Sequence, residues 1–415
     1  RAAGAPEPRP AGPPRRPPRR AGTARPSRPA APATGPRSAW TAPAGRGRPR
    51  AGAPRAVVFH EKLGSLADKA SRLGGLVAAL AGGEPDDPGG NGSGAPLAET
   101  LRSAARLAKA DLVSQTVIEF PVLQGVMGGL FAQAAGLGEA VSRAVGEHYR
   151  PLSGTAALPS TLPGALLAVA DKLDNIAGAW VAGEKPSGSR DPYGLRRAAM
   201  GVVRIALEYD LRFPFAGLLT AAVEQFELQG VDGLDAARRT AIVAETAAFV
   251  RERLQALLLD EGLPFPSVEA AMAAPVPDLP ALAARARAFT ALAGQAAFED
   301  AVIAYNRCAA LAAKDPAAGD RVVDPALFTD QAERELADAL EAARGPLLAS
   351  LDHLDLEAAV TAAAGLRSFV DRYFDAVLVM DPDDAVRANR LAQLAAVTGL
   401  IGRIGEFSRL PLGQS

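Results

Sequence analysis

Cysteine and histidine are scarce in this chain of 415 residues, which contains one Cys and three His. The single cysteine, Cys308, excludes a disulfide framework and any cysteine-based zinc site, and it fits a reducing cytoplasm. A hydrolytic metal centre needs several nitrogen or oxygen ligands and an open position for water. Three histidines supply few ligands for such a centre. We therefore expect a cytoplasmic protein that binds no metal or other cofactor itself.

Long uninterrupted apolar runs are also missing, although 48% of the residues are hydrophobic. Two long uncharged stretches, 120–138 and 151–170, contain glycines, prolines and polar side chains, and neither is the run of about 20 apolar residues that a spanning helix needs. The N-terminus lacks the apolar core of a signal peptide. Aromatic residues make up only 5%, whereas alanine and leucine dominate. This composition favours an all-α fold without a membrane segment.

Acidic residues are almost absent from residues 1–55, which hold 13 Arg, 14 Pro, no Lys and one acid, Glu7. The rest of the chain is acidic, with a net charge of −13. Such an Arg/Pro-rich segment cannot bury enough apolar surface to offset its ordering entropy, so we expect a disordered tail. It is either a basic arm for RNA or a stretch of biased composition produced by a slip of reading frame, and the composition favours the second interpretation.

Apolar residues at a spacing of three to four predict helices from residue 56 onward. The first would start near Phe59, and the second would run over 97–120. Further helices are expected over the ranges 136–151, 163–183, 191–207 and 234–261, and again from 281 to the end. Segment 82–94 is predicted to be a loop, and the Pro-rich segment 262–282 a connector with one short helix. The pattern predicts no strand.

Two acids, Asp171 and Asp174, lie three residues apart on one predicted helix, and Asp111 lies in a similar Leu/Ala-rich setting. An acid on an apolar helical face is costly unless it is paired or binds a metal. The pattern resembles the helical HD metal-phosphohydrolase superfamily, in which two histidines and two aspartates hold the metal. The resemblance would place the last aspartate at Asp171 and the adjacent His-Asp pair at Ala110-Asp111.

The metal ligands of that superfamily are incomplete here. Ala110 supplies no ligand, and Lys109 puts a cation beside the place that a metal needs. Only His60, Asp111 and Asp171 remain as positions of a degenerate site. We expect the acids to pair with Lys109, with Lys172 or with helix ends. A metal-dependent phosphohydrolase that uses His60, Asp111 and Asp171 is the alternative function.

The stretch "SGSRDPYGLRRAA" (187–199) joins a Gly/Ser turn to a helix that carries two arginines. Asp191 is a good helix N-cap and Pro192 suits the first helical position. The turn offers free backbone N–H groups beside Lys185 and Arg190, so it is able to hold a phosphate. Alternatively it is only a capped turn with solvated arginines, and spacing alone does not decide between the two.

The C-terminal region places three aromatic residues among arginines on one predicted helix, over 367–374. Arg387, Asn389 and Arg390 then open the last long helix. Arginines beside aromatic rings are able to stack on unpaired bases. Aromatic residues at this spacing are more often simply part of a core.

Several strings in order resemble the β subunit of the bacterial heterotetrameric glycyl-tRNA synthetase. The match runs from about Ala56 to the C-terminus and rests on the strings "VVFHEKLGSLADKASRL", "AARLAKADLVSQTVIEFPVLQGVMGG", "EHYRP", "AVADKLDNIAG", "KPSGSRDPYGLRRAAMGVVRI" and "LRSFVDRYFDAVLVMDPDDAVRANRLAQL". Val122 departs from the acid that is usual after "EFP". A full member of the family has a long N-terminal half before "VVFHEKLG", so we expect a C-terminal fragment or a misjoined reading frame.

The resemblance implies two modules, an HD-like helical domain over 56–215 and a helical-bundle anticodon-binding domain over 281–415, similar to that of arginyl-tRNA synthetase. With the disordered tail expected over 1–55 from composition, and a helical connector over 216–280, we expect four parts.

The resemblance also implies a role without chemistry on this chain. It implies an α2β2 glycine–tRNA ligase in which the α subunit binds ATP, Mg²⁺ and glycine, while the β chain holds tRNA(Gly) and supports α. The charge of −13 then requires local basic clusters rather than a broad basic face. The candidate tRNA-binding residues are Lys185, Arg190, Arg196, Arg197, Arg367, Arg372, Arg387, Asn389 and Arg390. A helical scaffold without a ligand is the remaining hypothesis.

Overall fold

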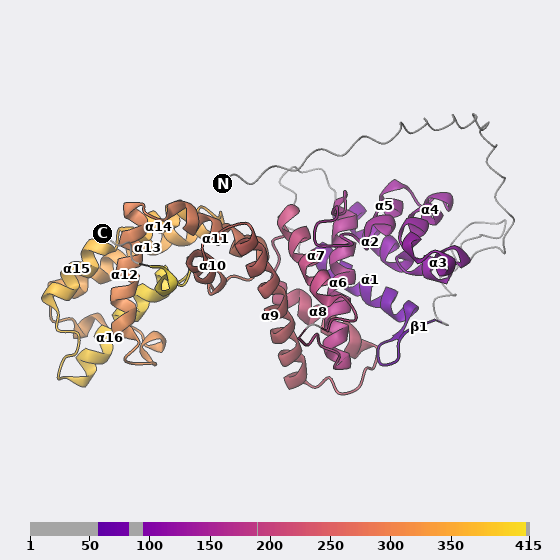
Figure 1. The fold of residues 1–415 in the computed structure, drawn as a ribbon. Helices are drawn as coiled ribbons and strands as arrows, with labels where there is room; N and C mark the ends of the chain where they lie inside the picture. Colours follow the sequence, from indigo (N-terminus) through magenta and orange to yellow (C-terminus); the bar gives the residue numbers. More distant parts are fainter. Residues whose placement is uncertain (1–56, 83–93, 189, 412–415) are drawn as a thin grey trace, which may run out of the picture. The chain divides into compact units, whose positions relative to one another are not determined.

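The computed structural model describes residues 57–82, 94–188 and 190–411, and the expected disordered tail and most of the expected loop at 82–94 lie outside these ranges. The described chain is almost entirely helical, which confirms the all-α prediction (Figure 1). One short antiparallel hairpin, β1 (Val58–His60) with β2 (Gly64–Ser65), was not predicted. Its turn uses Gly64 at φ +86°, a conformation that glycine adopts without strain.

The first helix group comprises the helices up to residue 260. Its members are α1 (Leu66–Gly82), α2 (Gly94–Leu107), α3 (Gln115–Glu119), α4 (Val126–Ala134), α5 (Glu139–Glu147), α6 (Leu162–Ala182), α7 (Leu195–Glu208), α8 (Phe215–Leu228) and α9 (Ala236–Asp260). Short 3₁₀ turns at Ala110–Val113 and Pro121–Leu123 flank α3.

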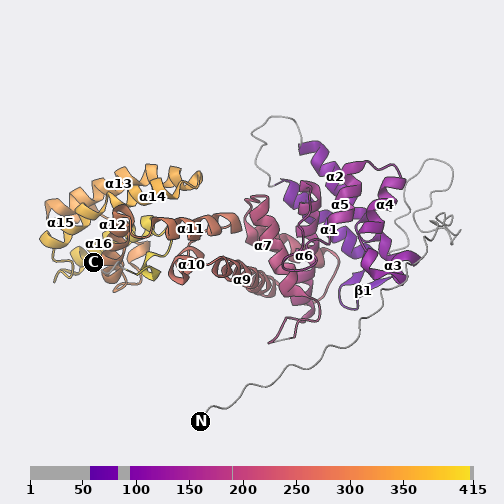
Figure 2. The same cartoon turned by 45° about the horizontal axis from the view of Figure 1, so that its top comes forward.

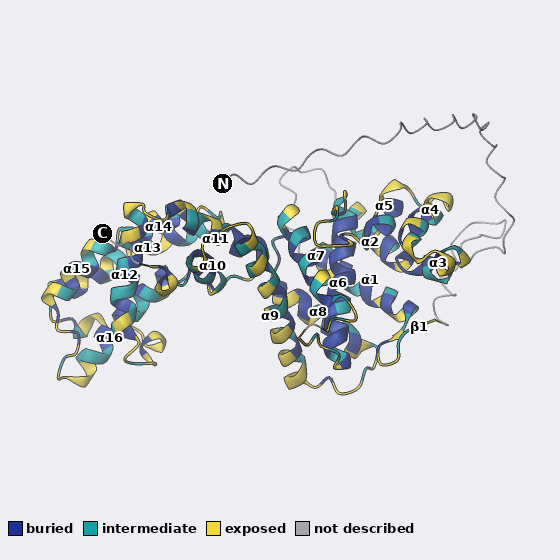
Figure 3. Ribbon diagram, viewed as in Figure 1, coloured by how far each residue is buried: buried dark blue, intermediate teal, exposed yellow. Residues whose placement is uncertain are grey.

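Helix α6 is the centre of this group, because α1, α2, α5, α7, α8 and α9 all pack against it. Nearly all of its residues are buried, so it is dark blue along its length in Figure 3. Its ends follow the sequence: the Thr161 side chain accepts a hydrogen bond from the N–H of Gly164, and Gly183 ends the helix at φ +79°. Its acids are therefore held inside the protein.

The predicted bounds of the first two helices were wrong. The first helix begins at Leu66 rather than near Phe59, because the preceding residues form the hairpin. The predicted helix 97–120 ends at Leu107 and gives way to a 3₁₀ turn and the short helix α3. The Ser114 side chain caps α3 and so starts a new element inside the predicted helix.

Helices α4 and α5 pack closely through glycine. A Cβ atom on Gly129 would lie 2.8 Å from the carbonyl oxygen of Ser142, and one on Gly128 would lie 2.8 Å from Cγ1 of Val145. Because no side chain separates the two backbones here, the helix pair forms a tight hairpin (Figure 1). Helix α4 was absent from the predicted elements.

The second helix group follows from residue 265. Its members are α10 (Phe265–Met272), α11 (Leu279–Leu292), α12 (Ala296–Ala312), α13 (Gln331–Asp352), α14 (Leu356–Ala364), α15 (Arg367–Ala376) and α16 (Asp384–Ile401), with short 3₁₀ turns at Ala318–Asp320, Pro325–Leu327 and Phe407–Arg409. Helices α12, α14 and α16 share a core, and α13 runs beside α14 (Figure 2). Asp330 and Glu333 form a capping box at the start of α13. No helix among the described residues is long and apolar enough to cross a membrane.

Candidate functional site

A buried ionic cluster lies where α1 meets α6. Nζ of Lys69 lies 3.1 Å from Oδ1 of Asp171 and 2.6 Å from Oδ2 of Asp174. Arg72 donates from Nε to Oδ1 of Asp174 at 2.6 Å, and Nζ of Lys109 lies 2.9 Å from Oδ1 of Asp171. All five side chains are buried. The two acids of α6 are thus neutralised inside the protein by three cations.

Lys109 also binds His148, the C-cap residue of α5. Nζ of Lys109 lies 2.9 Å from Nε2 of His148, and Nδ1 of His148 lies 2.7 Å from the carbonyl oxygen of Val145. Burial and the charge of Lys109 lower the pKa of His148 to about 3, so the ring is neutral. The neutral ring then carries its proton on Nδ1 and accepts the ammonium at Nε2.

The charges fix the ionisation of the other groups as well. Burial alone would raise the pKa of Asp171, but Lys109 and Lys69 outweigh it and lower that pKa. The ammonium of Lys109 also lies 3.9 Å from the centre of the Tyr149 ring, a cation–π contact. Lys172 was expected to pair with an acid, but it donates to the carbonyl oxygen of Arg150 at 2.6 Å instead.

Asp111 is also buried, but it takes no part in these ion pairs. Its Oδ2 accepts hydrogen bonds from the N–H groups of Gly125 at 2.6 Å and Gly128 at 3.1 Å, next to the first turn of α4. Burial raises its pKa, against these two hydrogen bonds and the charge of Lys109, which lower it. The carboxylate therefore holds the α4 turn in place, which is the expected pairing with a helix end.

The three degenerate positions do not converge. His60 lies in β1, not on the predicted helix, and its Nε2 bonds Glu184 at 3.2 Å, while Asp111 and Asp171 have the partners described above. The ammonium of Lys109 lies within hydrogen-bond distance of both the imidazole and the Asp171 carboxylate, so a divalent cation does not fit beside it. Within the described ranges no three His, Cys, Asp or Glu side chains are grouped to hold a metal.

The turn at 185–197 caps its own helix, but not as predicted. Helix α7 begins at Leu195 after Gly194, and Asp191 lies outside it. Both carboxylate oxygens of Asp191 accept hydrogen bonds, from the N–H of Leu195 at 2.7 Å and from that of Arg196 at 2.9 Å. The anion position at this helix end is therefore filled by the protein, and a phosphate would have to bind the side chains around the turn. Ser189 lies outside the described residues.

Two of the four basic side chains of this turn are bound to other groups of the described residues, and two are not. Lys185 pairs with Glu245, and Arg196 donates to the carbonyl oxygen of Gly188 at 2.6 Å. Arg190 and Arg197 are exposed and form no ion pair with any described residue. These two guanidinium groups are the most available to an anion.

In the second helix group, Arg390 and Asn389 are buried. Nε of Arg390 bonds Oε1 of Glu333 at 2.8 Å, and its NH groups bond Asp381 and Thr329, both at 2.7 Å. Asn389 accepts from the N–H of Asp324 at 2.7 Å and donates to its carbonyl oxygen at 3.0 Å. Both side chains are used within the protein, and neither is presented to a ligand.

The other three arginines of this region are more accessible. Arg367 pairs with Asp371 at 2.7 Å, Arg372 with Glu335 at 3.3 Å, and Arg387 with Asp384. The guanidinium of Arg372 also lies 4.6 Å from the centre of the Phe369 ring. Each pair is at least partly exposed, so an incoming phosphate competes with its carboxylate.

Sequence reasoning missed part of the buried cluster. Lys69 and Arg72 lie three apart on α1, and a pair of cations on the apolar face of a helix was a signal that buried acids face it. His148 lies in the string "EHYRP", and no spacing rule links it to Lys109, which is 39 residues earlier. Only the packing of α5 on α2 brings the two together.

Comparisons with known proteins agree with this architecture. Residues 50–273 match the family model described as glycyl-tRNA synthetase beta subunit, and residues 302–404 match that of the DALR anticodon binding domain. A glycine–tRNA ligase beta subunit of Moorella thermoacetica is 38% identical over 355 residues, covering 85% of this chain and 49% of the relative. The beta subunit of Cereibacter sphaeroides is 36% identical over 362 residues, covering 85% and 50%.

The chain thus spans about half the length of the curated relatives that it matches. The first family model covers more than half of this chain. The chain belongs to the glycyl-tRNA synthetase beta subunit family.

Proposed function

We propose that this chain is the tRNA-binding β subunit of a glycine–tRNA ligase. The observation that carries the proposal is the match of residues 302–404 to an anticodon-binding domain, on a helix group whose surface bears arginines beside aromatic rings. In this role the chain holds tRNA(Gly) in the cytoplasm while an α subunit attaches glycine. The partners are arranged as α2β2, and ATP and Mg²⁺ bind on α.

The buried cluster of the first helix group supports a role without chemistry on this chain. Nζ of Lys109 lies within hydrogen-bond distance of both Asp171 and His148, and the neutral His148 is used to bind that ammonium. Oδ2 of Asp111 accepts two backbone hydrogen bonds and Asp171 pairs with Lys69 and Lys109, so both acids are used within the protein. The alternative, a metal-dependent phosphohydrolase, has no observation in its favour.

Two basic surfaces would contact the RNA. The first is formed by Arg367, Arg372 and Arg387, where a phosphate would replace one exposed carboxylate of each pair. The second is the turn with Lys185, Arg190, Arg196 and Arg197. Asn389 and Arg390 would act indirectly, by fixing the start of α16. The chain is acidic overall and offers few basic side chains to RNA. RNA would therefore bind only where acidic neighbours do not repel its phosphates.

The proposal is tested by filter binding of tRNA(Gly) to the full chain and to the double variant Arg372→Ala/Arg387→Ala. We expect the double variant to bind about 10-fold more weakly, as for two lost phosphate contacts. Arg344→Ala is the matched control, because Arg344 pairs with Glu341 three residues away just as Arg387 pairs with Asp384. Equal affinity of all three proteins would contradict the anticodon-side role.

The role beside an α subunit is tested by aminoacylation. Glycine attachment to tRNA(Gly) should require a purified α subunit, and phosphoester hydrolysis by this chain alone should stay at the background rate with Mn²⁺ or Zn²⁺ present. Turnover of a phosphoester that is lost in Asp171→Asn would support the alternative function instead.

A further inference from the structure

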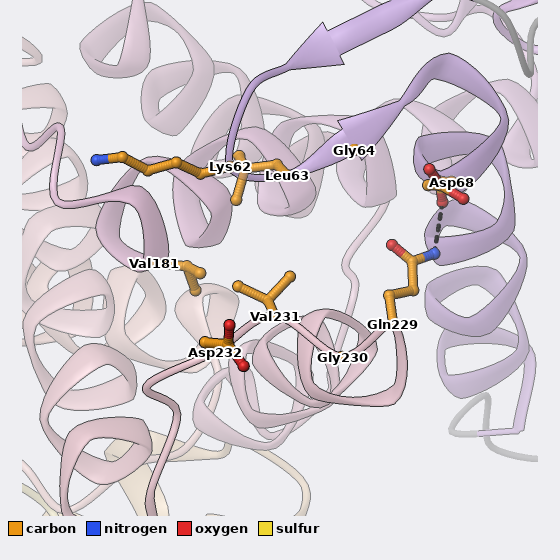
Figure 4. A pocket seen from close by; sticks show the side chains of 9 residues that line it. All are labelled: Lys62, Leu63, Gly64, Asp68, Val181, Gln229, Gly230, Val231 and Asp232. Atoms are coloured by element: carbon orange, nitrogen blue, oxygen red, sulfur yellow. Dashed lines mark hydrogen bonds between the residues drawn. The ribbon is translucent and has the colours of Figure 1, made fainter.

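One cavity of the first helix group has a volume of about 590 Å³ and is lined mainly by polar and small residues (Figure 4). Lys62, Gln229 and Asp232 belong to its wall, and no aromatic ring does. Gln229 is already used, because it donates to the carbonyl oxygen of Asp68 at 2.8 Å and accepts from Arg72 at 2.7 Å. This hollow offers no flat apolar face to a ligand.

A second cavity, of about 220 Å³, lies between β1, the C-terminal half of α6 and the turn before α7. It is smaller than the pockets of about 300–1,000 Å³ that take drug-sized ligands, so it suits a fragment the size of a single base. Its lining residues are Phe59, His60, Leu63, Asp174, Asn175, Ala179, Ala182, Glu184, Tyr193 and Leu195. We call it the Tyr193 pocket.

The walls of the Tyr193 pocket are aromatic and apolar. The rings of His60 and Tyr193 lie edge to face, with centroids 6.3 Å apart, and Phe59 and Leu63 line the cavity beside them. Tyr193 is 54% exposed, so its ring is accessible to a ligand at the edge of the pocket. Exposed aromatic rings of this kind are the platforms on which proteins stack unpaired bases.

Two polar groups of the Tyr193 pocket are fixed and complementary. The Oδ1 atom of Asn175 accepts from Lys69 at 2.8 Å, and its Nδ2 group has no hydrogen-bond partner among the described residues. The Glu184 carboxylate accepts from His60 at 3.2 Å and from the Tyr193 hydroxyl, and keeps further acceptor capacity. The pocket therefore offers one amide donor and one carboxylate acceptor, which is the pattern that the edge of a base satisfies.

Basic residues lie close in sequence to the residues that line the Tyr193 pocket. Lys185 follows Glu184 directly, and Arg190 and Arg197 lie three residues before and four residues after Tyr193. Arg190 and Arg197 are exposed and unpaired with any described acid. A base in the pocket would thus place its own phosphate, or the next one along an RNA strand, near cations that offset the Glu184 charge.

We propose that the Tyr193 pocket binds a single unpaired nucleobase, held against Tyr193 and hydrogen-bonded by Asn175 and Glu184. The base belongs to the tRNA, so this inference rests on the proposed function and gives the first helix group an RNA contact of its own. A free nucleotide has the same chemistry and is the other possible source of the base.

The test compares the full chain with Tyr193→Ala and Asn175→Asp in binding both tRNA(Gly) and free GMP, AMP, CMP and UMP. Loss of a stacking ring weakens RNA binding about 5- to 150-fold, and we expect Tyr193→Ala to fall in this range for tRNA. Asn175→Asp replaces the donor by an acceptor and should weaken binding as well. Phe120→Ala is the matched control, because Phe120 is 56% exposed and lies outside the pocket.

The outcomes separate the pocket from the proposed function. Weaker tRNA binding by both pocket variants, with Phe120→Ala unchanged, supports the pocket. Unchanged tRNA binding by both folded pocket variants, or an equal loss in Phe120→Ala, overturns it even if Arg372→Ala/Arg387→Ala weakens binding. If the wild-type chain binds a free nucleotide through Tyr193 but no tRNA, the tRNA role is overturned and a nucleotide site remains. Binding of neither overturns both.

Discussion

The ammonium of Lys109 and the imidazole of His148 meet at 2.9 Å inside the first helix group, with the lysine as donor and the neutral ring as acceptor. The same ammonium lies 2.9 Å from Asp171. One lysine therefore joins the end of α5 to α6 through two buried side chains. The first prediction follows from this contact.

Lys109→Met should destabilise the chain strongly. The variant leaves Asp171 with only Lys69 and His148 with no donor, and breaking a buried ion pair costs about 3–5 kcal/mol. The free energy of unfolding in urea measures the loss. Lys185→Met is the control, because the pair of Lys185 with Glu245 is about half exposed and such pairs contribute about 0–1 kcal/mol. Equal stabilities of the two variants would contradict the structural role of Lys109.

Acid should destabilise the fold through His148. Its folded pKa is about 3, below the unfolded value near 6.5, so between these values the unfolded chain takes up a proton that the folded chain refuses. This contribution to stability is complete above pH 6.5 and is lost as the pH falls toward 3, with a slope of about 1.4 kcal/mol per pH unit. Urea unfolding at several pH values measures the slope. His148→Gln should flatten it, and an unchanged slope in this variant would contradict the assignment.

Asp171 adds a second acid-sensitive contribution at lower pH. Its folded pKa is lowered, so its stabilising effect is present above the unfolded value near 4 and is lost as the pH falls further. Asp171→Asn should therefore reduce stability at pH 7 and weaken the remaining loss below pH 4. Thermal unfolding followed by circular dichroism at pH 3 and pH 7 compares the two. A variant that loses the same stability at both pH values would contradict the assignment.

Arg390→Gln should lower the free energy of unfolding, and not only weaken RNA binding. The variant leaves the buried Glu333 carboxylate without its guanidinium, a loss of about 3–5 kcal/mol, and it frees the turn before α16. Arg344→Ala serves as the control, since its exposed pair with Glu341 contributes about 0.3–0.5 kcal/mol. A variant of Arg390 that keeps its melting temperature but loses tRNA binding would show that Arg390 contacts RNA directly.

Gly129→Ala should disrupt the α4–α5 hairpin. The new Cβ would lie 2.8 Å from the carbonyl oxygen of Ser142, and such overpacking costs about 1–3 kcal/mol. Gly74 lies in α1 with no atom within 4 Å of its added Cβ, so Gly74→Ala should stabilise by about 0.5–1 kcal/mol. Opposite signs of the two changes in urea unfolding would confirm the close approach, and equal signs would contradict it.

The sequence predicted the fold class and the long helices α6 and α9, because their apolar patterns are not interrupted by single residues. It did not predict that α13 continues through Pro346. It failed where local side chains override periodicity. Ser114 caps a new helix within a continuous pattern, and the hairpin at β1 uses residues that also fit a helical face. Short elements of this kind depend on backbone partners that a spacing rule does not contain.

The sequence predicted some residues of the site, but not which of them contact each other. The pattern identified Asp111 and Asp171 as buried acids and Lys109 as the cation beside them. It did not identify His148, or the buried state of Arg390, because both depend on elements far apart in sequence. Whether an arginine is exposed depends on tertiary packing. Only the structure therefore separates the exposed candidate residues for RNA binding from the buried ones.

The first helix group carries its balancing cations as side chains. Lys69, Arg72 and Lys109 are bound covalently to the same polypeptide as the acids that they neutralise. These counterions cannot diffuse away from the acids, so the charge balance of the core is kept for as long as α1 and α6 stay packed together.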